Sequence, residues 1–106
     1  MSSILQTLEE MESLLRSHDL KEFADNIRGI AAQDNPAVFA EEISSFAVWG
    51  GNGSIVDVTL SDPIDERRFN ELIVDLAEAL DQLGIGTERS RWVAQIIEDW
   101  LIAHPK

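Results

Sequence analysis

The chain is organised around a glycine-rich stretch near its middle, Trp49-Gly50-Gly51-Asn52-Gly53-Ser54. This stretch holds three of the six glycines of the chain within four residues. Glycine is favoured where the backbone takes a positive φ or passes close to another group, so the cluster indicates a fixed irregular turn and not a linker. We therefore predict a structural loop built on Gly50, Gly51 and Gly53, with helices on either side of it.

Upstream of this loop, apolar residues recur at spacings of three and four, which places them on one face of each of three helices. The apolar positions are, in chain order, Ile4, Leu8, Met11 and Leu15; Leu20, Phe23, Ile27 and Ile30; and Phe39, Ile43 and Phe46. Asp19 followed by Glu22 predicts a capping box for the second helix. Asn35 before Pro36 predicts the start of the third.

Downstream of the loop, residues 55–60 alternate in the manner of a strand. With no second strand-like run to pair with, we expect a short extended segment packed on helices and not a sheet. A long helix follows Asp62-Pro63 and ends at Gly84, and Thr87 caps a last, widely apolar helix. The sequence therefore predicts an all-α fold of about five helices in one acidic domain, residues 1–106.

Charge is the unusual property of the composition. Twenty acidic residues against eight basic ones give a net charge of −12, where about 2–8 in magnitude is usual for a small domain. Such a body repels phosphate, so binding to nucleic acid or to an anionic membrane is disfavoured, and a basic protein is the favoured partner. Acids at positions 9, 10 and 12 interrupt any signal-peptide pattern, so we expect a cytoplasmic protein.

No motif predicts catalysis. The glycine loop opens an extended run and has no lysine beside it, unlike a phosphate-binding loop, so we favour a structural turn in which Asp57 accepts hydrogen bonds from loop N–H groups. An anionic substrate held there, with Asp57 as a catalytic residue, is the alternative. There is no cysteine, and His18 and His104 lack metal-ligand spacing. We therefore expect no enzyme activity, no cofactor and no metal.

A row of carboxylates is the candidate binding surface. Glu71, Asp75 and Glu78 follow one line of the long helix, with no lysine or arginine at the i+3 or i+4 positions between them. The row is either a solvated face or a surface for the lysines and arginines of a partner. To it we add Glu41 and Glu42, which begin the exposed side of the third helix, and the candidate aromatic anchor Trp49, with Trp92 or Trp100 if exposed.

The segment of about fifteen residues from 46 to 60 resembles a group of small bacterial domains. The shared pattern is aromatic-Gly-Gly-x-Gly-Ser-apolar-x-Asp, which reads Trp49-Gly50-Gly51-Asn52-Gly53-Ser54-Ile55-Val56-Asp57 in this chain. The resemblance implies a bacterial, mainly helical protein of a kind found among immunity proteins that are paired with secreted toxins. It assigns no functional residue.

Two functions remain open on the sequence. The first is an immunity protein that neutralises a basic toxin domain, for example a nuclease, by occluding it with its carboxylate surface. The second is a homo-oligomeric structural or regulatory subunit, such as a homodimer formed through the apolar last helix, whose acidity serves solubility.

Overall fold

The computed structural model describes residues 4–50 and 53–104, so the predicted loop residue Gly51 lies outside the described part of the chain. Within these residues the fold is all-α, without strands, which confirms the predicted fold class. The helices of eight or more residues are α1 (Ile4–Ser17), α2 (Lys21–Ala31), α3 (Pro36–Ile43), α5 (Pro63–Gln82) and α6 (Glu88–Ala103). A single-turn helix, α4 (Phe46–Trp49), and a 3-10 turn, η1 (Ile55–Asp57), lie between α3 and α5.

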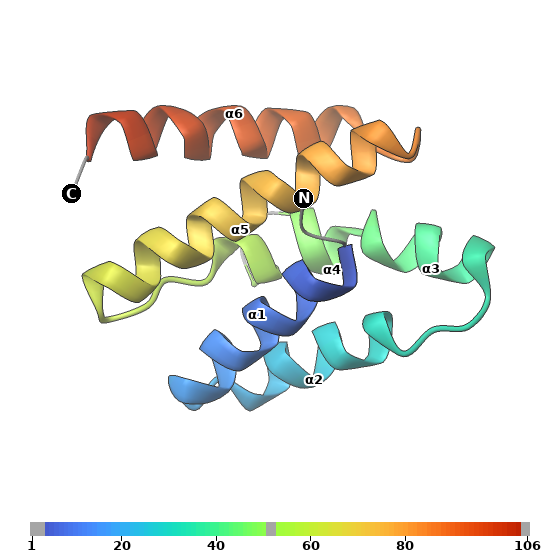
Figure 1. Ribbon diagram of the computed structural model, residues 1–106, viewed down its shortest axis with the longest axis horizontal. Helices are drawn as coiled ribbons and strands as arrows, with labels where there is room; N and C mark the ends of the chain where they lie inside the picture. Colours follow the sequence, from blue (N-terminus) through green and yellow to red (C-terminus); the bar gives the residue numbers. More distant parts are fainter. Residues whose placement is uncertain (1–3, 51–52, 105–106) are drawn as a thin grey trace.

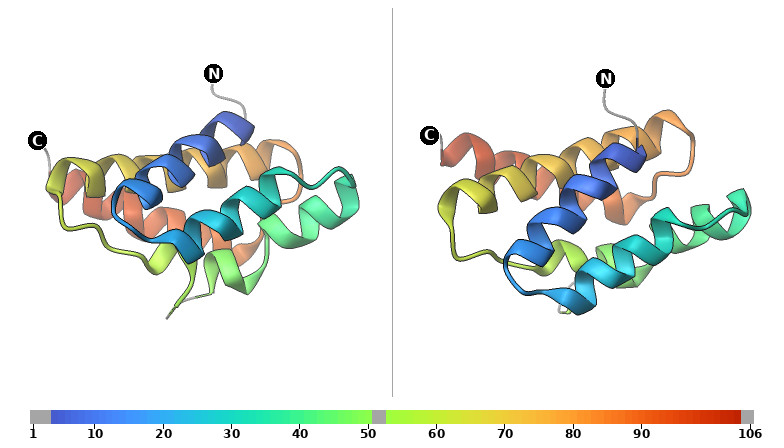
Figure 2. Two further views of the ribbon diagram at one scale, coloured as in Figure 1. Left: turned by 90° about the horizontal axis from the view of Figure 1, so that it is seen from below. Right: turned by 60° about the horizontal axis from the view of Figure 1, so that its bottom comes forward.

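The helices form two antiparallel hairpins that meet through α1 and α5. In Figure 1, α6, α5, α1 and α2 follow one another from top to bottom, and α3 lies to one side. The helix pairs in contact include α1 with α2, α5 with α6, and α1 with α5. Figure 2 shows α1 lying across the middle of the bundle, beside both α2 and α5. Helices α1 and α5 are therefore the central pair, and α6 is left with a broad solvent-facing side.

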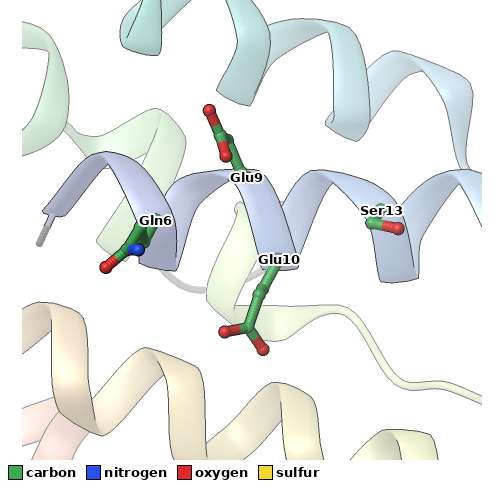
Figure 3. Close-up of a pocket in the computed structure, with 4 residues that line it drawn as sticks. All are labelled: Gln6, Glu9, Glu10 and Ser13. Atoms are coloured by element: carbon green, nitrogen blue, oxygen red, sulfur yellow. The ribbon is translucent and has the colours of Figure 1, made fainter. Parts of the chain in front are cut away.

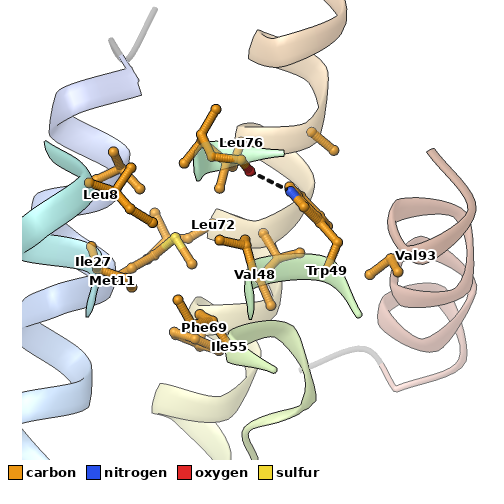
Figure 4. Close-up of a cluster of buried hydrophobic side chains, with 14 of the residues drawn as sticks. Leu8, Met11, Ile27, Val48, Trp49, Ile55, Phe69, Leu72, Leu76 and Val93 are labelled. Carbon is orange, nitrogen blue, oxygen red and sulfur yellow. Dashed lines mark hydrogen bonds between the residues drawn. The ribbon is translucent and has the colours of Figure 1, made fainter. Parts of the chain in front are cut away.

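The core lies where the apolar faces of these helices converge on α4 and η1 (Figure 4). Leu8 and Met11 of α1 and Phe69 and Leu72 of α5 are almost completely buried, as the periodicity predicts. Trp49 is buried among them. Burial of each such side chain contributes on the order of 1.5–3 kcal/mol, so this cluster fixes how the two hairpins dock.

Three helix starts carry side-chain caps, of which Asn35 and Thr87 were predicted and Asp62 was expected only as part of a turn. The Asn35 side chain accepts from two backbone N–H groups at the start of α3, and the Asp62 side chain does the same for α5. Thr87 forms a reciprocal capping box with Ser90 in α6. Because such caps satisfy donors that the helix leaves unpaired, they define the starts of these helices locally.

The predicted extended segment, residues 55–60, is wrong in its first half. Residues 55–57 form the 3-10 turn η1, and the backbone is extended at the next residue, Val58, where φ is −67° and ψ is 135°. Ile55 is drawn into the core, whereas Val56 and Val58 are both only partly buried. Two inward apolar side chains, Ile55 and Leu60, and a turn therefore replace the expected alternation.

The predicted third helix and the capping box of the second helix also need correction. Helix α3 ends at Ile43 because the hydroxyl of Ser45 donates to the carbonyl of Glu42 and competes with helix continuation. Phe46 consequently starts α4 and is exposed. At the first hairpin turn, Asp19 takes a left-handed conformation with φ of 62°, and α2 begins without a side-chain cap.

Candidate functional site

The basic residues of the described chain are engaged within the molecule. Six of the lysines and arginines form ion pairs with carboxylates: Arg16, Lys21, Arg28, Arg67, Arg68 and Arg91. Arg89 instead donates from Nε to the carbonyl of Trp49 at 2.9 Å, with its guanidinium 4.8 Å from the ring centre of Trp92. The only other basic residue of this kind, Lys106, lies outside the described part. The surplus negative charge therefore stands on the surface.

The carboxylate row on α5 is only partly as predicted. Asp75 and Glu78 are exposed, and neither forms an ion pair with any described residue. Glu71 is different, because Arg67 lies 3.8 Å and Arg68 3.6 Å from its carboxylate oxygens. These arginines precede Glu71 by four and three residues, outside the intervals considered from the sequence. The prediction of an unneutralised row is therefore wrong at Glu71.

The packing of α6 on α5 supplies a further carboxylate. Arg67 donates from Nη1 to the carbonyls of Leu101 and His104, at 3.3 and 2.6 Å. At the other end of the pair, Arg91 contacts Asp81 at 3.0 Å. These two contacts set an antiparallel register in which residue 98 of α6 lies opposite residues 70–74 of α5.

Glu98 occupies that position and is partly exposed. It forms no ion pair with any described residue, because Arg67 and Arg91 are committed to the two ends of the helix pair. We call Asp75, Glu78 and Glu98 the α5–α6 acidic face. The sequence did not identify Glu98, because its position beside α5 depends on the register between two helices. The apolar pattern of a single helix does not determine that register.

The predicted pair Glu41 and Glu42 is not part of this face. Both residues lie on α3, which packs against α2 and α4. Glu42 is partly buried and accepts a hydrogen bond from the Gln33 amide at 3.0 Å, whereas Glu41 is exposed. Glu41 and Glu42 therefore do not extend the row on α5.

Trp49 is not a surface anchor, which corrects the prediction. Its side chain is 0% exposed, and its indole Nε1–H donates to the carbonyl of Ile43 at 2.8 Å (Figure 4). Gly50 follows it where a Cβ atom would collide with the Phe46 carbonyl, so glycine permits the close turn that points Trp49 inward. The exposed aromatic residues of this region are instead Phe46 and Trp92.

The glycine loop has the internal hydrogen bond that the sequence predicts. Gly53 has a φ of 86°, and its N–H donates to Oδ2 of Asp57 at 3.3 Å. The carboxylate of Asp57 thus closes the turn on itself. This contact supports a structural role for Gly50, Gly53 and Asp57. It does not favour an anionic ligand, because a carboxylate already accepts from a backbone N–H of the loop.

A hollow of the described chain is lined by polar side chains of α1. It is shallow, with a volume of about 380 Å³, and its lining residues are Gln6, Glu9, Glu10 and Ser13 (Figure 3). Glu9 points toward α2, and Glu10 points toward α5, where it accepts from Arg68 at 2.7 Å. Within the described residues no three His, Cys, Asp or Glu side chains gather as metal ligands, and no helix is long and apolar enough to cross a membrane.

One carboxyl group has a perturbed affinity for its proton. Burial raises the pKa of Glu66 above its ordinary value, and the hydrogen bond that its Oε2 accepts from the N–H of Leu60 at 3.3 Å opposes this shift. Glu66 is one of the residues that line a hollow of about 250 Å³ between α6 and residues 56–59. No described basic residue forms an ion pair with it, so its shift reflects its partial burial.

Comparison with known proteins returns no relative: no family model, curated protein or solved structure matches the chain. The resemblance of residues 46–60 to bacterial immunity-type domains therefore stays a prediction. The surface of the molecule carries the functional argument.

Proposed function

We propose that the chain is an acidic protein-binding module that neutralises a basic protein. In its most concrete form it is a cytoplasmic bacterial immunity protein that occludes a cationic toxin domain, such as a nuclease. The observation that supports this proposal is the α5–α6 acidic face, whose three carboxylates have no ion-pair partner among the described residues while the described lysines and arginines are engaged elsewhere.

In the isolated protein, repulsion between carboxylates of the same face slightly lowers the stability of α5. Asp75 and Glu78 are three residues apart on one helix, and like charges at such spacing destabilise a helix by about 0.2–0.5 kcal/mol. A cationic surface placed against them removes this repulsion. It also accelerates encounter, because complementary charge steers association and raises its rate by roughly 10- to 1000-fold at low salt.

The test measures association with a basic protein that the chain retains in a pull-down from the source organism. The test variant reverses the α5–α6 acidic face with Asp75→Lys, Glu78→Lys and Glu98→Lys. The matched control reverses three carboxylates elsewhere, Glu22→Lys, Asp34→Lys and Glu41→Lys, and so changes the net charge by the same amount.

We expect stopped-flow association to be at least ten-fold slower for the face variant and within about three-fold of the unmodified protein for the control. The unmodified on-rate should fall as salt rises, because exposed charges are screened beyond about 8 Å at physiological ionic strength. Equal on-rates for the two variants would show that net charge alone acts and that the α5–α6 acidic face is not the binding surface.

A homo-oligomeric subunit is the second candidate, and the exposed apolar side chains of α6 favour it. Trp92 and Ile96 both face solvent in the single chain. Sedimentation of the purified protein separates the two functions. A stable homodimer that shields Trp92 from a fluorescence quencher supports the subunit, and a monomer supports a different partner.

A further inference from the structure

Helix α6 presents a ridge of large apolar side chains to solvent. Trp92 is 56% exposed and Ile96 is 48% exposed, and the two lie one turn apart. Phe46, at the start of α4, is 80% exposed. Arg89 connects the two elements, because it stacks on Trp92 and lines a hollow together with Phe46. We call Phe46, Arg89, Trp92 and Ile96 the apolar ridge.

The ridge is held in place from beneath. Arg89 donates to the carbonyl of the buried Trp49, and its guanidinium covers one face of the Trp92 ring. This contact restrains the Trp92 side chain before any partner arrives. A restrained tryptophan loses little conformational freedom on binding, which is why such residues serve as anchors of protein interfaces.

Two hollows adjoin the apolar ridge, one at Phe46 and Arg89 and the other at Ile96. One, of about 200 Å³, is lined by Ser44, Ser45, Phe46, Thr87 and Arg89. The other, of about 250 Å³, lies between residues 56–59 and the Ile96, Ile97 and Trp100 side chains. Each is several times the roughly 30 Å³ that one water occupies in the liquid, so each accommodates an apolar side chain.

The charges around the ridge indicate what covers it. Glu88 and Asp99 of α6 and Asp57 of η1 border it, all three exposed and none in an ion pair with a described residue. The one cation in the ridge, Arg89, is already bound to Trp49 and Trp92. A second copy would bring the same carboxylates and a body of charge −12 against this border, so like-charge repulsion opposes it.

We propose that the apolar ridge binds an amphipathic basic segment of the partner. Apolar side chains of that segment fill the two hollows that adjoin the ridge, and its lysines or arginines meet the carboxylates of the border. This inference rests on the proposed function, since it takes the partner to be basic, and it adds where the partner is anchored. The α5–α6 acidic face then steers the encounter, and the ridge holds the complex.

The experiment uses two synthetic 18-residue peptides as probes. One is an amphipathic leucine and lysine helix, and the other keeps every lysine but replaces each leucine with glutamine. Binding to the full chain is measured by titration calorimetry. The ridge variant combines Trp92→Ala with Ile96→Ser, and the control is Ile102→Ser, which also truncates an exposed apolar side chain of α6. Unchanged circular dichroism and melting temperature establish that both variants fold.

We expect the leucine and lysine peptide to bind the unmodified chain at least ten-fold more tightly than the glutamine peptide does. The ridge variant should bind it at least ten-fold more weakly, and Ile102→Ser within two-fold of the unmodified chain. If the ridge variant binds normally while the Asp75→Lys, Glu78→Lys, Glu98→Lys variant does not, the ridge is not the anchor and the proposed function stands. A homodimer that the ridge variant dissociates would also overturn the inference, because a second copy would then cover the ridge.

Discussion

Replacing Trp49 with phenylalanine distinguishes a core tryptophan from a binding tryptophan. The indole N–H donates to the carbonyl of Ile43, a residue that is itself fully buried. Phenylalanine has no donor, so this carbonyl loses its partner at a cost of about 1–3 kcal/mol. The smaller ring also leaves a cavity, and loss of packing adds roughly another 1 kcal/mol. We therefore expect Trp49→Phe to lower the free energy of unfolding by about 2–4 kcal/mol.

This loss is large relative to the roughly 5–15 kcal/mol that stabilises a typical domain. For a chain of this length it corresponds to a fall in melting temperature of roughly 9–18 °C. Urea unfolding followed by circular dichroism measures it. The matched control is Trp92→Phe, which alters an exposed ring stacked under Arg89 and should cost less than about 1 kcal/mol. If the two substitutions cost the same, Trp49 does not hold the centre of the core.

Two further predictions concern single positions. Gly50→Ala places a Cβ against the Phe46 carbonyl and should lower the free energy of unfolding, measured in urea, by about 1–3 kcal/mol. The control Gly29→Ala, in an open helical position of α2, should raise it by about 0.5–1 kcal/mol. An increase for both variants would contradict the close turn at Gly50. Glu66→Gln removes a carboxylate whose pKa is raised in the folded state, so the folded protein binds this proton more tightly than the unfolded chain and gains stability as pH falls through the raised value. The variant should therefore be more stable than the unmodified protein at pH 7, and this advantage should shrink toward pH 4; an advantage that grows on acidification refutes the assignment.

The helices were predictable because their signals are local. Apolar spacing along one face indicated α5, and the predicted caps at Asn35 and Thr87 marked the starts of α3 and α6. The wrong predictions arise where tertiary packing or an alternative short-range hydrogen bond overrides the local pattern. Periodicity continued through Ser45, but its hydroxyl ended α3. Alternating apolar residues predicted an extended segment from Ile55. In the structure the Ile55 side chain is buried in the core, and its backbone forms a turn.

The residues of the candidate site were predictable only where their exposure depends on the pattern of a single helix. Exposure of Asp75 and Glu78 follows from their place opposite the apolar stripe of α5. Glu98 and the pairing of Arg89 with Trp92 depend on how α6 sits against α5 and α4, and no single-helix pattern contains that information. Trp49 was misplaced for the same reason, because a tryptophan beside a glycine turn has no periodic partner that reports which way it points.

The pairing of the bundle into two hairpins has a consequence for how the chain reaches its native state. Helices α1 and α2, and helices α5 and α6, are neighbours along the chain as well as in space (Figure 1). Each pair closes a short loop, so little chain entropy is lost before its contacts form. Low contact order of this kind gives helical proteins folding times of microseconds to milliseconds. The α1–α2 hairpin can therefore assemble while α5 and α6 are still being synthesised.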